Sequence, residues 1–349
     1  MRITLIVPVR NEAAHIHRTL SGLAEQSFPT SDYEIIVVDG MSEDGTANIV
    51  RELQQTVPNL HLFENPKRLA SSARNIGVQN ASGEFLSIVD GHCQIRDSHF
   101  LTKLVEAFEM SGADTLGRPQ PLRAKSPTRF QNAVSAARAS WLGHNPKSAI
   151  FSDGDRFVPA DNVAVAYRRE VFEKAGLFDE TFDACEDVEF NTRVRRAGLT
   201  CYFTPTIAIE YQPRSTLKGL VHQMSRYGRG RAKLAQKHLA TITLASLIPP
   251  LWFSWLLFAS VISLIWSPMI WALCGSMTVY SFVLLGESHR LWRMDRELSY
   301  RRMPAIFAAI HVGFACGYLR EMLVIVTSWP TLAVWTALRR LAGNRMRKA

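Results

Sequence analysis

The sequence feature that most limits what this chain can fold into is a long stretch without charged side chains, from Leu239 to Gly286. A bilayer core takes about 20 apolar residues for each spanning helix, so the stretch is long enough for two. Ser267-Pro268 lies near its middle and suits a turn. We therefore expect a hairpin of two membrane-spanning helices, over residues 241–266 and 268–286. A pair of buried core helices is the alternative, and the unbroken absence of charge argues against it.

Basic residues on both sides of this hairpin predict its orientation. The formal net charge of the chain is +9. By the positive-inside rule both basic groups belong in the cytoplasm, and a hairpin allows this because it returns the chain to the side it left. We expect a multi-pass protein of the cell's inner (plasma) membrane, with its soluble part in the cytoplasm. The basic residues are Lys218, Arg226, Arg229, Arg231, Lys233 and Lys237 before the hairpin, and Arg290, Arg293, Arg296, Arg301 and Arg302 after it.

A third apolar stretch, over residues 303–338, does not have the pattern of a single membrane-spanning helix. It is interrupted by Arg320-Glu321 and by Trp329-Pro330, and a basic tail over residues 339–349 follows it. One full span would place this tail outside the cell, against the positive-inside rule. A re-entrant segment, an interfacial segment or two short spans would keep it inside, and the sequence leaves these alternatives open.

The amino terminus and the cysteines indicate a reducing compartment. The chain starts as a strand at Arg2 to Val7, without the charged leader, apolar core and cleavage site of a secretory signal. The five cysteines are scattered without a CxxC pair, which predicts neither a disulfide framework nor a zinc site.

The first part of the chain alternates short β-branched runs with amphipathic stretches, the pattern of an α/β fold with a parallel sheet. No GxGxxG or GxxxxGK[ST] follows any strand, which argues against a standard dinucleotide fold or a P-loop ATPase. A basic amphipathic helix over residues 216–240, with an apolar stripe of Leu217, Leu220, Val221 and Met224, is expected on the membrane surface. Strands are expected at residues 3–7, 34–38, 60–63, 85–89, 162–167 and 200–203, and helices at 13–26, 46–57, 71–80, 169–175 and 187–197.

Polar clusters follow three of these strands, at Pro8 to Glu12, at Asp39-Gly40 and at Asp90-Gly91-His92. The carboxyl ends of parallel strands meet at one edge of a sheet, where α/β proteins bind their ligands. Acidic groups there can meet the ribose and base of a nucleotide, and an Asp-x-His pair can hold a divalent metal against a phosphate. Taken singly, each cluster also fits a turn or a helix cap, and Asp44 before Gly45-Thr46 is interpreted as a cap.

An ordered set of motifs resembles the inverting glycosyltransferases of family 2, which have a GT-A fold, a Rossmann-like α/β domain. The resemblance covers roughly residues 1–227, and the added spans are similar to the exopolysaccharide branch of that family, the succinoglycan-biosynthesis type. The motifs are Val7-Pro8-Val9-Arg10-Asn11-Glu12, Ile36 to Gly40 with Ser42, Asp44 and Thr46, Ala73-Arg74-Asn75-x-Gly77, Asp90-x-His92, Gly176 to Glu180, and Glu186-Asp187.

The resemblance implies where a nucleotide-sugar donor and a metal bind. Asp39 matches the position that holds the uridine of a UDP-sugar, with Pro8, Arg10 and Glu12 beside it and Arg74 as a weaker candidate. Asp90 and His92 match the DxD element that binds Mg²⁺ or Mn²⁺ on the diphosphate. Histidine in place of the second Asp offers a softer nitrogen donor, which should favour Mn²⁺ over Mg²⁺.

Glu186-Asp187 opens a predicted helix, and Asp187 matches the catalytic base of the family, with Glu186 beside it. An inverting transfer needs one carboxylate near the acceptor hydroxyl to take its proton as the oxygen attacks the sugar, help worth about 10² to 10⁴ in rate. The alternative is that both acids only cap the helix, where the helix dipole favours them.

Gln223 to Tyr227 is similar to the QxxRW element of membrane-bound synthases, with Tyr in place of Trp. That element binds the donor and the acceptor terminus, which implies acceptor and diphosphate roles for Gln223, Arg226 and Tyr227. Arg229 follows at glycine-separated spacing and could close over the diphosphate. For Arg231 and Lys233 we expect contact with anionic lipid instead.

The combined expectation is a metal-dependent inverting glycosyltransferase that uses a nucleotide sugar and a lipid-linked saccharide acceptor, on polyprenyl diphosphate, at the cytoplasmic membrane face, in exopolysaccharide or related glycan synthesis. No nucleic-acid partner is expected. Two alternatives stay open: direct transfer to polyprenyl phosphate, and a non-catalytic nucleotide-sugar-binding membrane scaffold. The expected division is a GT-A domain over residues 1–215, the interfacial helix over 216–240, membrane segments over 241–338 and the basic tail over 339–349.

Overall fold

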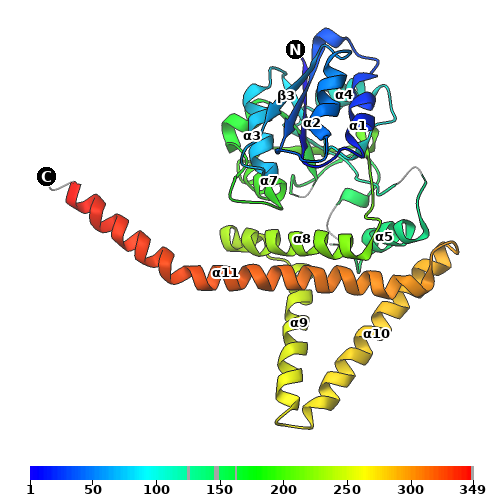
Figure 1. Ribbon diagram of the computed structural model, residues 1–349, viewed down its shortest axis with the longest axis vertical. Coiled ribbons are helices and arrows are strands. Elements are labelled where there is room, and N and C mark those ends of the chain that lie inside the picture. The colour runs from blue at the N-terminus through cyan, green and yellow to red at the C-terminus, as the bar shows by residue number, and fades with distance from the viewer. Residues whose placement is uncertain (124–125, 145–148, 162, 347–349) are drawn as a thin grey trace.

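The computed structural model describes residues 1–123, 126–144, 149–161 and 163–346, of which 328–346 are described by their backbone alone. An α/β domain forms one end of the molecule (Figure 1). Two long helices that lie side by side run beneath it, and a V-shaped helical hairpin points away from the domain (Figure 1).

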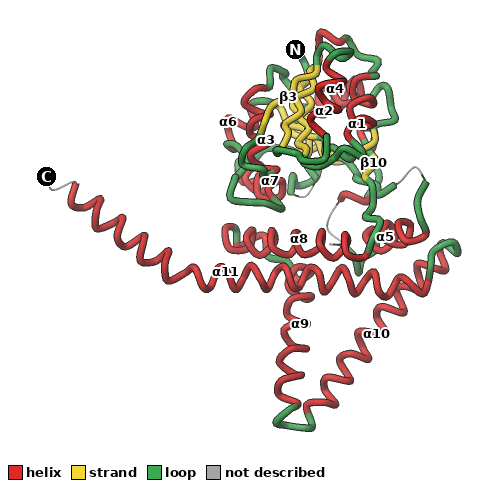
Figure 2. Tube along the Cα trace, viewed as in Figure 1, coloured by secondary structure: helices red, strands yellow, loops and turns green. Residues whose placement is uncertain are grey.

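The first half of the domain is the predicted parallel sheet. Its strands are β1 (Ile3–Val9), β2 (Tyr33–Asp39), β3 (Leu60–Glu64) and β4 (Phe85–Ile88), in the order β3-β2-β1-β4 and all parallel. The helices between them are α1 (Ile16–Ala24), α2 (Thr46–Gln54) and α3 (Ala70–Asn80). Figure 2 shows the strands enclosed by helices, which agrees with runs of β-branched residues buried on both faces.

The second half extends the same sheet with mixed strand directions. The order continues from β4 through β8 (Ala164–Arg168), β6 (Thr115–Gly117), β9 (Cys201–Phe203) and β7 (Arg156–Phe157). β8 is antiparallel to both of its neighbours, and β6 and β9 are parallel. Of the strand expected at 162–167, residue 162 lies outside the described residues. The predicted α/β class, with a parallel sheet in the first half of the domain, is thus confirmed.

Two helices of the domain were not predicted from the sequence. They are α4 (Phe100–Ser111) and α5 (Arg129–Ala139). The helices α6 (Glu170–Ala175) and α7 (Glu186–Arg196) fall close to their predicted positions, and a small second sheet pairs β5 (Cys93–Gln94) with β10 (Glu210–Tyr211). Short 3-10 turns lie at η1 (Thr30–Asp32), η2 (Ala149–Phe151), η3 (Pro205–Ile207), η4 (Leu239–Thr241) and η5 (Tyr300–Arg302).

The carboxy-terminal part contains the helices α8 (Leu217–Lys237), α9 (Leu244–Ser263), α10 (Met269–Met294) and α11 (Met303–Met346). Among the described residues, three segments are long and apolar enough to cross a membrane: Leu244–Ser263, Met269–Met294 and Tyr300–Thr327. The first two form the hairpin, with a turn at Ser267-Pro268, and α10 continues beyond Gly286 to Met294. α11 lies along α8 and crosswise to α9 (Figure 1), and its helix continues into the expected tail, of which residues 347–349 lie outside the described residues.

α8 packs against protein with the face that was expected to meet the membrane. Leu220 and Met224 are buried in one cluster with Phe307 and Ile310 of α11, while Leu217 and Val221 stay exposed. The backbones of α8 and α11 can approach closely because glycines lie at their contact. A Cβ on Gly317 of α11 would lie 2.0 Å from the carbonyl oxygen of Ser225 on α8. Two residues of the apolar stripe of α8 thus pack on α11, and two stay exposed. The placement of α8 on the membrane surface stays a prediction.

Candidate active site

The ends of β1 and β2 bring the first two polar clusters together. Val9 pairs with Asp39 in the parallel register. Asp39 is buried, and its carboxylate accepts hydrogen bonds from the backbone N of Ser42 at 2.9 Å and from its Oγ at 2.5 Å. Arg10 is exposed and lies against Gly40, where a Cβ would stand 3.2 Å from the Arg10 Cβ. Pro8 and Arg10 flank Val9, the strand partner of Asp39, so the two clusters lie at the same edge of the sheet.

Asp44 joins these two loops. Its carboxylate accepts hydrogen bonds from the backbone N of Ala13 at 3.0 Å and from Thr46 Oγ1 at 2.6 Å. The N-cap residue of α2 is Gly45, in the left-handed region at φ 92°. Asp44 Oδ1 also accepts a hydrogen bond from the backbone N of Thr46, the first residue of α2, at 3.1 Å. Asp44 therefore caps the helix from the position before Gly45, as interpreted, and it also ties the loop after β1 to the loop after β2.

The third cluster faces the loop after β1. His92 Nδ1 lies 3.0 Å from Glu12 Oε1. Burial alone would lower the pKa of the His92 imidazole, but the hydrogen bond with Glu12 and the charges of Asp90 and Glu12 outweigh it, so this pKa is raised. A Cβ on Gly91 would come within 2.7 Å of Val9 Cγ1, so the Asp-Gly-His turn needs its glycine to approach β1. The carboxylate of Glu12, which was predicted to bind the donor, contacts His92 in this structure.

Arg74 connects the third cluster with α7. This buried side chain on α3 lies with Nη2 3.8 Å from Asp90 Oδ1 and with Nη1 3.0 Å from Glu186 Oε1. Burial opposes its charge, but the carboxylates of Glu186, Asp187 and Asp90 outweigh burial and raise the Arg74 pKa. Its Nε finds no hydrogen-bond partner. The structure therefore places Arg74 between the two acidic clusters rather than beside Asp39.

Glu186 and Asp187 occupy the first turn of α7 in different environments. Glu186 is buried against Arg74, and burial raises its pKa although the Arg74 charge opposes this. Asp187 is half-buried, and its Oδ1 accepts a hydrogen bond from the backbone N of Val188 at 2.8 Å. The N-cap residue is Cys185, at φ 60°, and its own side chain makes no capping hydrogen bond. Glu186 is thus held in an ion pair with Arg74, while Asp187 accepts from a first-turn backbone N–H, as the capping alternative expects.

The basic residues of α8 contact the loop that precedes α7. Arg226 Nη2 donates to the carbonyl of Asp183 at 2.7 Å. Arg229 Nη2 lies 2.5 Å from Asp183 Oδ2, and its Nε lies 3.7 Å from Glu321 Oε2 on α11. Arg229 was predicted to close over the diphosphate; both of its contacts are instead with carboxylates of the chain. Lys233 donates to the carbonyl of Thr181 and so contacts the domain, where lipid contact was expected.

Tyr227 presents an aromatic ring next to the same loop. The ring is 38 % exposed, and the Arg138 guanidinium of α5 lies 5.5 Å from its centroid. Gln223 Nε2 lies 3.4 Å from the Tyr227 hydroxyl, one turn away on α8. Arg138 is buried and was missed from the sequence, because nothing in the local pattern of α5 distinguishes it from other helical arginines.

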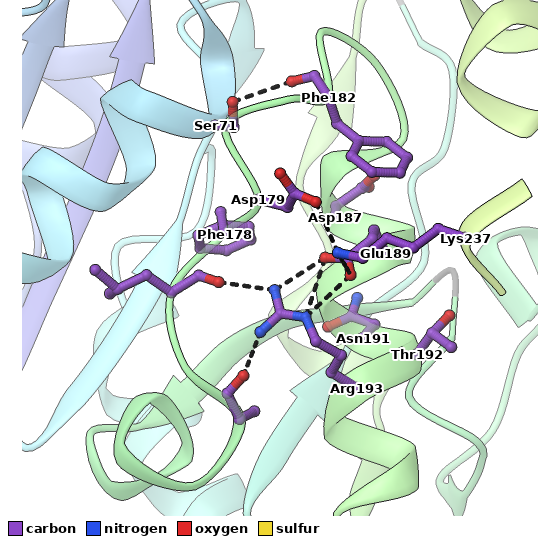
Figure 3. Close-up of polar contacts among 12 residues, drawn as sticks. Ser71, Phe178, Asp179, Phe182, Asp187, Glu189, Asn191, Thr192, Arg193 and Lys237 are labelled. Carbon is purple, nitrogen blue, oxygen red and sulfur yellow. Dashed lines mark hydrogen bonds and ion pairs between the residues drawn. The ribbon is translucent and has the colours of Figure 1, made fainter. Parts of the chain in front are cut away.

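A charged cluster at the start of α7 was also missed. Figure 3 shows Glu189 and Arg193 of α7 together with Lys237 of α8 and Asp179 of the preceding loop. The Glu-x-x-x-Arg spacing on a helix was the one available signal, since residues four apart share a face.

Comparison with known proteins identifies the family of the chain. Residues 4–176 match the family model described as glycosyl transferase family 2, and residues 99–338 match the one described as glycosyl transferase family group 2. The chain belongs to glycosyl transferase family 2. It is 28% identical over 323 residues to the succinoglycan biosynthesis protein ExoA of Rhizobium meliloti (strain 1021), an alignment that covers 91% of this chain and 94% of the relative.

A second relative comes from an archaeon. The dolichyl N-acetyl-alpha-D-glucosaminyl phosphate 3-beta-D-2,3-diacetamido-2,3-dideoxy-beta-D-glucuronosyltransferase of Methanococcus voltae is 25% identical over 331 residues, covering 92% of this chain and 97% of the relative.

Solved structures share the fold. The mannosyltransferase PcManGT from Pyrobaculum calidifontis, in complex with GDP-Man and Mn²⁺, has a TM-score of 0.56 at 21% identity and covers 90% of this chain and 86% of that one. S. aureus TarS 1–349 in complex with UDP has a TM-score of 0.51 at 16% identity, with 93% and 92% covered. These likenesses show the GT-A fold.

Proposed function

We propose that this glycosyltransferase is an inverting enzyme that moves a sugar from a nucleotide sugar, with a UDP-sugar as the expected donor, to a lipid-linked saccharide at the cytoplasmic membrane face. One observation carries the proposal: Arg74 lies between Asp90 and Glu186, so the strand-end clusters and the first turn of α7 face one site. The relatives support it, because the names of two of them refer to succinoglycan biosynthesis and to a dolichyl phosphate saccharide.

On the donor side, Asp39 would bind the nucleotide, with Pro8 and Arg10 at the same strand ends. Asp90 and His92 fit a divalent ion: Asp90 is partly exposed, and the bond from His92 Nδ1 to Glu12 is the kind of outer contact that orients a ligating imidazole. Among the described residues no three acidic, His or Cys side chains form a metal site, so substrate oxygens and water would complete the coordination. A bound Mn²⁺ or Mg²⁺ supplies positive charge that stabilises the leaving diphosphate.

On the acceptor side, Asp187 would act as the general base. The acceptor oxygen forms a bond to the sugar C1, the bond from C1 to the diphosphate oxygen breaks on the opposite side, and the Asp187 carboxylate takes the acceptor proton. Glu186 is paired with Arg74, which leaves Asp187 as the half-buried carboxylate at this helix start. Gln223, Arg226 and Tyr227 would meet the acceptor, since α8 lies between the domain and the hairpin (Figure 1).

The test incubates membranes that carry the protein with a panel of labelled nucleotide sugars and organic-extractable lipid acceptors. We expect label in one lipid fraction, and we expect Asp187→Asn to lower its rate of appearance by about 10² to 10⁴, the usual contribution of a general base. Asp153→Asn, at an exposed position away from the site, is the control and should keep the wild-type rate.

Two results would contradict the proposal, and each would favour one of the alternatives. Turnover that survives Asp187→Asn largely intact would indicate transfer to polyprenyl phosphate, whose attacking oxygen is already ionised and needs no base. Nucleotide binding without any transfer by the wild-type protein would indicate a binding scaffold.

A further inference from the structure

Glu189 is a fully buried carboxylate that the proposed mechanism does not use. It lies on α7 one turn after Glu186 and has no exposed surface. Its oxygens accept from Arg193 Nη2 at 2.9 Å, from Lys237 Nζ at 2.6 Å and from His238 Nε2 at 3.0 Å. A buried carboxylate stays charged only when it is paired and hydrogen-bonded, and these partners lower the Glu189 pKa although burial opposes them.

The partners of Glu189 also hold the loop over residues 176–185. Lys237 Nζ lies 2.6 Å from Asp179 Oδ2, and Arg193 Nη2 donates to the carbonyl of Leu177 at 2.7 Å (Figure 3). This loop leads directly into Glu186-Asp187. The cluster of Glu189, Arg193, Lys237 and Asp179, here called the Glu189 cluster, therefore fixes the chain immediately before and after the proposed base.

The opposite side of the same loop is held by the sheet domain. Asn75 of α3 donates to the carbonyl of Phe178 at 2.9 Å and accepts from its backbone N at 2.8 Å. Ser71 Oγ donates to the carbonyl of Phe182 at 3.0 Å (Figure 3). The start of α7 thus has two supports, one from α3 and one from α8.

The support from α8 belongs to the carboxy-terminal helices. Lys237 is the last residue of α8, and the chain passes through η4 directly into the hairpin helix α9. α8 packs closely on α11: a Cβ on Gly228 would lie 2.1 Å from the carbonyl oxygen of Phe314, so the two backbones meet there with no side chain between them. The Glu189 cluster is therefore an ionic connection between these helices and the helix that carries Asp187.

We propose that Glu189 is a positioning residue, which holds the first turn of α7 against the end of α8 and so sets where Asp187 stands relative to an acceptor brought by the membrane. The assignment of Asp187 as base rests on the proposed function; the connection between α7 and α8 does not. Glu189 touches neither substrate nor reacting atoms. Its removal should lower kcat and leave donor binding unchanged, because Asp39 and its loop lie on other elements.

The experiment uses the full chain in lipid nanodiscs and the labelled nucleotide sugar that supports transfer. We expect Glu189→Gln and Lys237→Met each to lower kcat by about 10- to 100-fold, the cost of misplacing a catalytic group by about 1 Å, with the donor KM within about twofold. Because both variants break one connection, the double variant should be little worse than either single one. Lys218→Met removes a charge from an exposed position on α8 and should keep the wild-type kcat.

Hydrogen exchange of the same samples separates this proposal from the identity of the base. The amides of residues 186–196 should exchange faster in both variants, and those of β1 and β2 should not, whether or not Asp187→Asn abolishes transfer. Lys237→Met leaves the pair of Glu189 with Arg193 intact, so it decides the question if Glu189→Gln does not fold. Unchanged kcat and exchange in Lys237→Met, or losses that multiply in the double variant, would overturn the proposal.

Discussion

At the scale of single residues, the geometry of the site depends on which acidic side chain pairs with which basic side chain. Glu12 and His92 are separated by 80 positions in the sequence, and their contact exists only because β1 and β4 are neighbours in the sheet. The partners of Arg229 also come from distant segments, because its guanidinium forms ion pairs with Asp183 and Glu321. The sequence identified these residues as polar and well placed, but their partners come from distant segments.

Glu12→Gln tests the contact with His92. It removes the negative charge that orients the imidazole, and loss of such an outer contact typically costs about 10- to 100-fold in metal affinity. We expect the apparent affinity for Mn²⁺, read from transfer at varied free Mn²⁺, to fall by that amount. In the wild-type protein Mn²⁺ should support faster transfer than Mg²⁺ at matched free concentration, because His92 is a nitrogen donor.

Glu25→Gln, just after α1, provides the matched control and should leave the metal titration unchanged. If Glu12→Gln instead raised the donor KM and left the Mn²⁺ titration as it was, the expectation that Glu12 binds the donor would hold and the role of orienting His92 would fail. Much faster transfer with Mg²⁺ would contradict the assigned role of His92.

At the scale of elements, the pair of α8 and α11 depends on glycines. Gly313 and Gly317 are one turn apart on α11, and each meets the α8 backbone, at Val221 and at Ser225. Small residues at this spacing let helix backbones approach closely, as they do between membrane helices. In the sequence, the glycines of α8 indicated only the spacing of its arginines, and they did not predict a close helix contact.

Gly317→Ala tests this packing. The new Cβ would lie 2.0 Å from the carbonyl oxygen of Ser225, a contact with backbone that cannot move aside. Overpacking of this kind costs about 1–3 kcal/mol, so we expect a lower thermal midpoint of the full chain in detergent. Gly275→Ala on α10, where a Cβ would meet nothing within 4 Å, is the control and should not lower the midpoint. Equal midpoints for the two variants would refute close packing at Gly317.

Local patterns predicted most elements of the sheet domain. β1, β2, β3 and β4 follow from their β-branched runs, and α7 follows from its acidic first turn and basic last turn. The α4 helix was missed although Phe100, Leu101, Leu104 and Phe108 have helical spacing, so the signal was present and was not used. The orientation of β8 could not be predicted, because strand direction depends on which distant strand becomes its neighbour.

At the scale of the whole molecule, the domain lies on one side of the pair of α8 and α11, and the hairpin of α9 and α10 extends from the other side (Figure 1). Large apolar side chains such as Leu264 and Trp271 are exposed on the hairpin, at 84% and 78%. Lipid is the environment in which such exposure is stable. α11 lies across the hairpin direction (Figure 1), which favours an in-plane segment among the alternatives that the sequence left open.

The side on which the chain ends tests this arrangement. If α11 lies in the membrane plane, the basic tail over residues 339–349 stays on the same side as the domain, as the positive-inside rule requires. A fluorescent protein that matures only in the cytoplasm should glow when fused after Ala349, and alkaline phosphatase at the same place should be inactive. The same reporters fused after Ser267 should give the opposite pattern. Active phosphatase at the carboxy terminus would show that α11 spans the membrane.

The sequence by itself predicted the family and the α/β class of this protein, and it carried the proposals for its site. Its strand ends carry Asp39 and Asp90, its helix start carries Asp187, and its charge-free stretch predicts a hairpin, because composition and periodicity act over neighbouring residues. Only the tertiary structure decided that Glu12 holds His92, that Arg74 joins Asp90 to Glu186, and that Glu189 ties α7 to α8. The physical reason is that such contacts join residues far apart in the chain, and no local pattern records which of them meet.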